Sequence, residues 1–205
     1  MWNTDNSSQV LWLSGPPECN IHQVSPYIVG LEKEKKHSVL YFFCSSPARG
    51  ESVTTAFVHT LLCQLLCCSP VDKKTSIVRD FLRALLEGII KKGAFNQRLL
   101  QSKEESPPDM KIKEILNGSS RNELWAALQA TLDHKQSWGL LIVIDGLDKV
   151  RQEKYQFIDS VRVFIDHLQQ RTSKVKILLT SRPQDDIKEV LNRLPCIEYD
   201  KERKG

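Results

Sequence analysis

The chain has 205 residues, of which 40% are hydrophobic and 26% are charged, as is ordinary for a soluble globular domain. Its 29 Lys and Arg residues nearly balance its 25 Asp and Glu residues, so charge gives no argument for nucleic-acid binding. No apolar run approaches the roughly 20 residues of a membrane-spanning helix, and the polar N-terminus lacks a secretory signal, so we expect a cytoplasmic protein without a membrane span.

The first part of the chain predicts two buried strands with a helix between them. Residues 10–14 form a short apolar run that ends in the turn of residues 15–17 (Gly-Pro-Pro). Residues 20–35 become helical in their later part, and Ser25-Pro26 predicts a late helix start, with the serine as N-cap. Residues 38–44 are rich in aromatic and β-branched side chains and predict the second strand.

The middle of the chain is mostly helical in pattern. Apolar residues at helical spacing predict amphipathic helices at residues 58–66 and 77–91. Residues 101–118 are polar and contain two prolines, so we expect a loop there, either alone or with one short helix. Ser120 and Glu123 then form an S-x-x-E capping box, which predicts the start of a further helix.

The last part of the chain alternates strands with helices. The uninterrupted apolar run at residues 140–144 predicts a central parallel strand that is buried on both faces. Residues 157–168 carry a helical stripe, residues 175–180 predict a strand, and a helix at 184–193 precedes a short strand at 196–199. This alternation predicts an α/β fold of three layers with a mainly parallel sheet.

The turn after the first strand holds the first candidate site. A P-loop, which binds nucleotide phosphates, has the pattern G-x-x-x-x-G-K-[ST]. Aligned from Gly15, that pattern requires Gly, Lys and a hydroxyl where this chain has Asn20, Ile21 and His22. In a P-loop the Lys contacts the β- and γ-phosphates, and the hydroxyl helps to bind Mg²⁺. This chain lacks both groups at those positions, although a ring nitrogen of His22 can still donate a hydrogen bond. The candidate binding residues of this degenerate loop are Gly15, Pro17, Asn20 and His22.

The second candidate site follows the central strand, in the sequence LLIVIDGLDKV. Apolar residues followed by an acid at the strand end are typical of a Walker B motif, in which Asp145 would bind Mg²⁺ directly or through water. Asp148 could orient a water molecule or support the metal, so both aspartates are candidate catalytic residues. The alternative is an ordinary Asp-Gly turn at the end of a strand.

The third candidate site follows the strand at residues 175–180. Thr180 or Ser181 could contact a γ-phosphate or its water, and Arg182 could supply positive charge to the phosphates. The alternative is a helix N-cap and turn, with Arg182 on the surface.

Together these motifs, VLWLSGPP, SVLYFFC, LLIVIDGLDKV and ILLTSRP, resemble the NACHT-type STAND NTPases, in particular the nephrocystin-type N-terminal domain of large fungal proteins. The resemblance implies a P-loop NTPase core at residues 10–200, between tails at 1–9 and 201–205. It implies about five strands in the order 5-1-4-3-2. The family's second motif reads DGLDE, so Lys149 departs from it. The chain would be an excised domain or a truncated relative.

Members of that family are switches in which ATP or GTP binding biases an oligomeric form, and some act in fungal self/non-self recognition. The resemblance and the lost Lys predict a pseudo-NTPase that binds ATP or GTP with Mg²⁺ weakly and is not an efficient enzyme. One alternative is an active hydrolase in which Lys33, Lys35, Lys36 or Lys149 replaces the lost Lys. The other is a scaffold that does not bind nucleotide. Expected partners are a second copy or an effector protein, and not nucleic acid.

Overall fold

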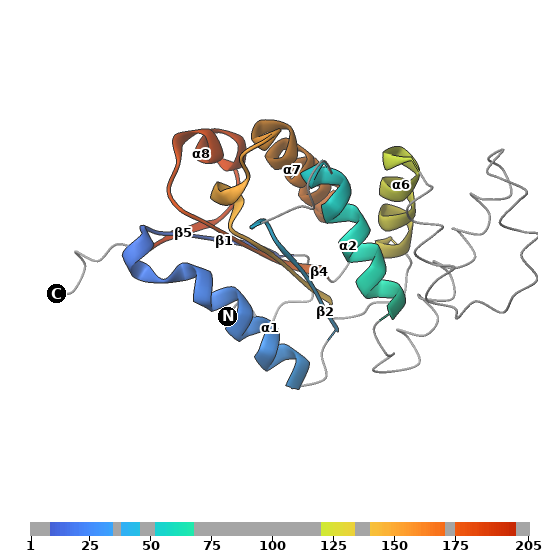
Figure 1. Ribbon diagram of the computed structural model, residues 1–205, viewed down its shortest axis with the longest axis horizontal. Coiled ribbons are helices and arrows are strands. Elements are labelled where there is room, and N and C mark those ends of the chain that lie inside the picture. Colours follow the sequence, from blue (N-terminus) through green and yellow to red (C-terminus); the bar gives the residue numbers. More distant parts are fainter. Residues whose placement is uncertain are drawn as a thin grey trace, which may run out of the picture. The chain divides into compact units, whose positions relative to one another are not determined.

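The computed structural model describes residues 9–34, 38–45, 52–67, 120–133, 140–170 and 175–199 (Figure 1). The helix predicted at 77–91, the loop at 101–118 and, apart from Gln9, the two tails lie outside these ranges. The chain divides into two compact units, one formed by residues 1–57 and 135–205 and the other by residues 58–134. Among the described residues, no helix has both the length and the apolar character that crossing a membrane requires.

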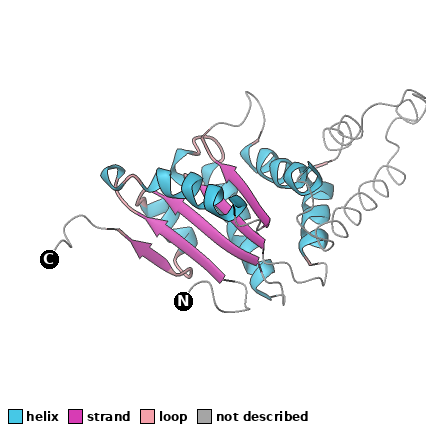
Figure 2. Cartoon of the chain, turned by 90° about the horizontal axis from the view of Figure 1, so that it is seen from below, coloured by secondary structure: helices cyan, strands magenta, loops and turns pink. Residues whose placement is uncertain are grey.

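The first unit is built on one sheet of five parallel strands (Figure 2). The strands are β1 (Gln9–Ser14), β2 (Ser38–Phe43), β3 (Leu140–Asp145), β4 (Val175–Ser181) and β5 (Cys196–Glu198). They lie in the order β2-β3-β4-β1-β5, and every pairing is parallel. The predicted α/β class, parallel sheet and strand order are therefore confirmed, since 5-1-4-3-2 is this order read from the other edge.

Helices cover both faces of this sheet. Helix α1 (Val24–Glu34) lies on one face, and α7 (Lys154–Gln170) and α8 (Asp185–Leu191) lie on the other (Figure 1). Because its neighbours and both helical layers surround it, all six residues of β3 are buried. This explains why its sequence is continuously apolar until it reaches Asp145.

The two faces of the sheet bury different side chains. Towards α1, Val29 packs with aliphatic residues of β2, β3 and β4, namely Val39, Leu141, Val143 and Leu178. Towards α7 lies a cluster of aromatic rings, formed by Phe42 of β2, Phe57 of α2 (Val53–Cys67) and Phe157 and Phe164 of α7. Ring centroids in this cluster are 5.4–6.1 Å apart, within the range of favourable aromatic contacts.

The second unit contains the later part of α2 and helix α6 (Arg121–Leu132). The predicted capping box is present, because the Ser120 hydroxyl accepts the N–H of Glu123 and the Glu123 carboxylate accepts the N–H of Ser120 at 2.8 Å. The Ser120 hydroxyl also donates to the Glu123 carboxylate at 2.7 Å, and this bond first, then the bond from the Ser120 N–H, lowers the pKa of Glu123. The capping box therefore fixes where α6 begins.

The start of α1 differs from the prediction. The helix begins at Val24, directly after the 3₁₀ turn η2 (Ile21–Gln23), so Ser25 is not its N-cap. Ser25 is fully buried and its hydroxyl has no hydrogen-bond partner among the described residues. Pro26 is tolerated here because a proline in the first helical turn removes an N–H that has no acceptor within the helix.

Candidate functional site

A cavity of about 190 Å³ lies at the carboxyl ends of β1, β3 and β4. Parallel strands all end at the same edge of a sheet, so the three predicted motifs meet there. Every predicted site residue except Asn20 lines the cavity, namely Gly15, Pro17, His22, Asp145, Asp148, Thr180, Ser181 and Arg182. Ile21 and Lys149 line it as well.

Asp145 is fixed at the end of β3 by its neighbour on β4. The hydroxyl of Thr180 donates to Oδ1 of Asp145 at 2.7 Å and accepts the N–H of Gly146 at 3.1 Å. Asp145 and Thr180 are 3% and 1% exposed, so this bond satisfies a buried carboxylate. Thr180 thus orients Asp145, in addition to any contact with a ligand.

We expect the Thr180→Val variant to be less stable by about 1–3 kcal/mol, because one oxygen of the buried carboxylate loses its donor. Urea denaturation measures this change in the free energy of unfolding. Thr180→Ser keeps the hydroxyl and is the matched control, which should be clearly more stable than the valine variant. Equal stability of the two variants would contradict the proposed orienting bond.

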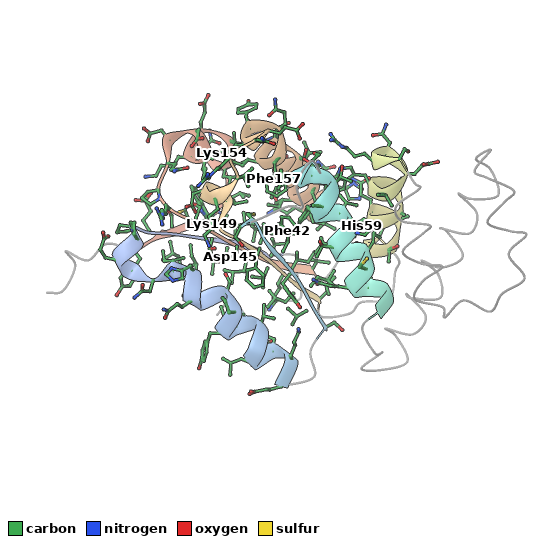
Figure 3. All side chains as sticks on the ribbon, in the orientation of Figure 1. Phe42, His59, Asp145, Lys149, Lys154 and Phe157 are labelled. Carbon is green, nitrogen blue, oxygen red and sulfur yellow. The ribbon has the colours of Figure 1, made fainter. Side chains whose placement is uncertain are left out.

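The second oxygen of Asp145 faces a cation from the same turn. Nζ of Lys149 lies 3.5 Å from Oδ2, and Figure 3 labels the two residues next to each other. Lys149 belongs to the 3₁₀ turn η3 (Leu147–Lys149), which Gly146 opens in the left-handed conformation with φ of 75°. Asp145 therefore has a partner for each carboxylate oxygen.

Asp148 and Arg182 form a second pair across the cavity. The backbone N–H of Arg182 donates to Oδ1 of Asp148 at 3.0 Å, and its Nε lies 3.5 Å from Oδ2. This contact holds the chain after β4 against η3. The interpretation that places Arg182 simply on the surface is incomplete, because the residue is exposed but anchored to Asp148.

The loop after β1 uses its own amides in local turns. After Gly15 the chain forms η1 (Pro17–Cys19) and then η2, and α1 follows. Five backbone N–H groups here already donate to protein carbonyls, those of Gly15, Cys19, Asn20, Gln23 and Val24. Pro16 and Pro17 have no N–H to offer. A P-loop instead directs such amides at phosphate, whereas these five amides donate to carbonyls of the protein itself.

Ile21 fills the space beside Gly15. A Cβ at Gly15 would lie 2.4 Å from Cδ1 of Ile21 and 3.3 Å from Cβ of Tyr199, so a larger residue there would require the Ile21 side chain to move. The Gly15 N–H also donates to the carbonyl of Ser181 at 3.3 Å. At the position where a P-loop has its Lys, an apolar side chain therefore packs onto the glycine and leaves the cavity without that ammonium group.

One family of known proteins matches most of the chain. The family described as nephrocystin 3, N-terminal, matches residues 1–79 and 66–182. The chain belongs to the nephrocystin 3 N-terminal family. No curated protein matches it. Among solved structures, a chain of the Drosophila ORC bound to AT-rich DNA and Cdc6 is similar at 13% identity, with a TM-score of 0.42. The match covers 95% of this chain but only 48% of that one.

In this nephrocystin 3 N-terminal domain, the predicted site residue Asn20 and the possible substitute Lys33 are not among the residues that line the cavity. Asn20 adopts φ of 50° between η1 and η2 and is absent from the cavity lining, so its role is in the turn. Asparagine suits that position because its side chain tolerates the left-handed region. Nζ of Lys33 lies 4.5 Å from the ring centroid of Tyr41, beside the sheet face under α1, and Lys33 is not among the residues that line the cavity. Lys35 and Lys36 lie outside the described residues.

The Ser181 side chain forms a hydrogen bond between β4 and β1 that the sequence analysis did not predict. Its hydroxyl accepts the indole N–H of Trp12 at 2.9 Å, and both residues are 3% exposed. The bond ties β4 to β1 just below the cavity. Of the two predicted sensor hydroxyls, that of Ser181 is therefore held by Trp12 and that of Thr180 by Asp145.

The negative charge of Asp145 affects the pKa of the Cys44 thiol, which directly follows β2. The thiol is 1% exposed, and the N–H of Cys44 donates to the carbonyl of Asp145 at 2.9 Å. Burial first, and then the negative charge of Asp145, raises the pKa of this thiol far above its ordinary value. Both effects favour the neutral thiol of Cys44 over the thiolate.

The side chains at the cavity do not fit a Mg²⁺ ion bound between the loop after β1 and the Walker B residue Asp145. The hydroxyl that would complete such a site is replaced by His22, and the oxygens of Asp145 already face Thr180 and Lys149. Mg²⁺ requires oxygen ligands at about 2.0–2.1 Å in near-octahedral geometry. The assignment of Asp145 as a metal ligand stays a prediction, and these contacts count against it.

Proposed function

We propose that this domain is a nucleotide-binding regulatory module that binds ATP or GTP weakly and hydrolyses it poorly, that is, a pseudo-NTPase. The observation that carries the proposal is the loop after β1, where Ile21 packs onto Gly15 and the amides donate to their own turns. Membership of the nephrocystin 3 N-terminal family supports nucleotide binding as the ancestral role.

The expected loss of affinity follows from the missing contacts. A charge-assisted hydrogen bond from a Lys to phosphate contributes about 1.5–3 kcal/mol, and the lost amide contacts add to this. Together they weaken binding on the order of a hundredfold or more relative to an intact P-loop. Lys149, Arg182 and His22 still line the cavity, so weak binding of phosphate groups is retained.

The cellular setting is part of the proposal and depends on the motif resemblance. We propose a cytoplasmic module of a fungal signalling or self/non-self recognition protein. Its partners would be a second copy of the chain or an effector protein. Binding of nucleotide would then bias an association equilibrium without requiring hydrolysis.

Thermal denaturation with ATP, GTP and ADP tests the proposal. At ten times the Kd a ligand stabilises the folded state by about 1.4 kcal/mol, or a few degrees in Tm for a domain of this size. We expect such a shift at millimolar nucleotide. At about 10 µM nucleotide we expect almost no shift, because weak binding leaves most of the protein without ligand at that concentration. Arg182→Gln, which removes an exposed cation, should reduce the shift.

Each alternative function gives a different result in the same experiment. A shift that saturates at low micromolar nucleotide would contradict weak binding. Steady hydrolysis that Asp145→Asn abolishes would indicate an active enzyme. An unchanged Tm with all three nucleotides, together with self-association, would indicate a scaffold that does not use nucleotide.

A further inference from the structure

Both carboxylates of the cavity are covered by cations of the same chain. The Asp145 and Asp148 side chains are 4% and 8% exposed, whereas those of their partners, Lys149 and Arg182, are 36% and 57% exposed. The negative groups therefore lie at the base of the cavity and the positive groups lie nearer to solvent. A ligand that enters from solvent meets an ammonium and a guanidinium group before it meets a carboxylate.

The turn after β3 holds Lys149 in this position. Its N–H donates to the carbonyl of Gly146 at 2.9 Å. A Cβ at Gly146 would lie 2.8 Å from Cδ and 3.2 Å from Nζ of Lys149, so the lysine side chain runs closely over the glycine. Gly146 has the left-handed conformation that other residues rarely adopt, and a side chain added there would require the lysine to move away from its position over the glycine.

We propose that Lys149 is an internal counter-ion that takes the place of Mg²⁺ at Asp145, so that the cavity accepts a phosphate-bearing anion without a metal ion. The identity of that anion as a nucleotide rests on the proposed function, whereas the replacement of the metal does not. The ammonium has three donors, so it can keep one on Asp145 and offer others to phosphate oxygens. Arg182 offers a planar fork of donors beside it.

A divalent cation is disfavoured by the same contacts. To reach Asp145, Mg²⁺ would have to approach Oδ2 where Nζ of Lys149 lies 3.5 Å away, and the two positive charges would repel each other. The other oxygen already accepts the Thr180 hydroxyl. The lysine therefore excludes the metal electrostatically, and removing its charge should create a metal site.

Mn²⁺ alone, used as a paramagnetic substitute for Mg²⁺, tests this in the absence of nucleotide. Loss of the free-ion signal in electron paramagnetic resonance measures binding. We expect Lys149→Met, which keeps an unbranched apolar side chain, to bind Mn²⁺ about tenfold or more tightly than the unchanged chain. Lys149→Arg keeps the charge and should show no gain.

A double variant locates the new site. Lys149→Met combined with Asp145→Asn should lose the gain in Mn²⁺ affinity, because the carboxylate is removed. Thermal denaturation of each variant shows that it is folded. Equal Mn²⁺ affinity of the unchanged chain and the methionine variant, or a gain that survives Asp145→Asn, would overturn the proposal.

A second arm measures ATP affinity of the unchanged chain by calorimetry, with Mg²⁺ or with EDTA. We expect the two affinities to agree within about twofold, and a tenfold increase with Mg²⁺ would overturn the proposal. If ATP binds under neither condition, the proposed function fails, while the Mn²⁺ comparison still decides the role of Lys149. The two failures are thus distinguishable.

Discussion

The Ile21→Lys variant should bind ATP about tenfold to a hundredfold more tightly than the unchanged chain, corresponding to roughly 1.5–3 kcal/mol for one charge-assisted contact. Residue 21 is where the P-loop pattern has its Lys, and its side chain already lines the cavity. The methylene groups of a lysine can cover Gly15 much as Ile21 does and bring an ammonium group to the phosphates. Isothermal titration calorimetry measures the change.

Ile21→Met is the matched control for this prediction. It replaces the branched side chain by an unbranched one without charge, so it should leave the affinity unchanged. The gain with lysine should also decrease as salt is raised, because it depends on charge. An equal gain with methionine would show that packing beside Gly15 limits binding, and no gain with lysine would show that the turns of the loop keep phosphate away.

Hydrolysis should stay low in the lysine variant, although binding improves. The residue that follows Asp148 is Lys149, which is paired with Asp145 and cannot act as a carboxylate base. Tight binding without turnover would show that nucleotide affinity depends on residue 21, whereas hydrolysis depends on the turn after β3. Rapid turnover would instead show that residue 21 alone limits both binding and hydrolysis.

The sheet and the meeting of the three motifs could be predicted from the sequence. The apolar run of β3 admits few alternatives, because a strand with no polar residue until Asp145 must be buried on both faces. Once β4 is placed beside β3, parallel pairing brings Thr180 to the same edge as Asp145. These conclusions need only periodicity and the rule that parallel strands end together.

The partners of the site residues could not be predicted in this way. The pairing of Lys149 with Asp145 depends on the left-handed conformation of Gly146, and the DGLDK sequence fits an exposed lysine equally well. The bond from Trp12 to Ser181 joins residues 169 positions apart, and it depends on the directions of the two side chains as well as on the pairing of β1 with β4. Spacing identified which residues gather at the edge, but side-chain geometry decides which of them remain available to a ligand.

The Phe157→Ala variant should lose about 3–5 kcal/mol of stability, the usual cost of removing a fully buried aromatic ring. Phe157 is 0% exposed, and its ring centroid lies 5.8 Å from that of Phe57 and 6.1 Å from that of Phe42 (Figure 3). These contacts attach α7 to β2 and to the start of α2. Urea denaturation measures the loss as a lower midpoint.

Tyr155→Ala is the matched control, because Tyr155 lies on the same helix but is 62% exposed, and its loss should change stability by no more than about 0.5 kcal/mol. Equal effects of the two variants would show that the aromatic cluster does not stabilise the unit.

Phe157 does not line the cavity, so ATP affinity at a temperature where Phe157→Ala remains folded should match that of the unchanged chain. Ile21→Lys should do the opposite, changing affinity and little stability. Such a pair of results would mean that the stability of the sheet and its core does not depend on the loop after β1, as the proposed pseudo-NTPase requires.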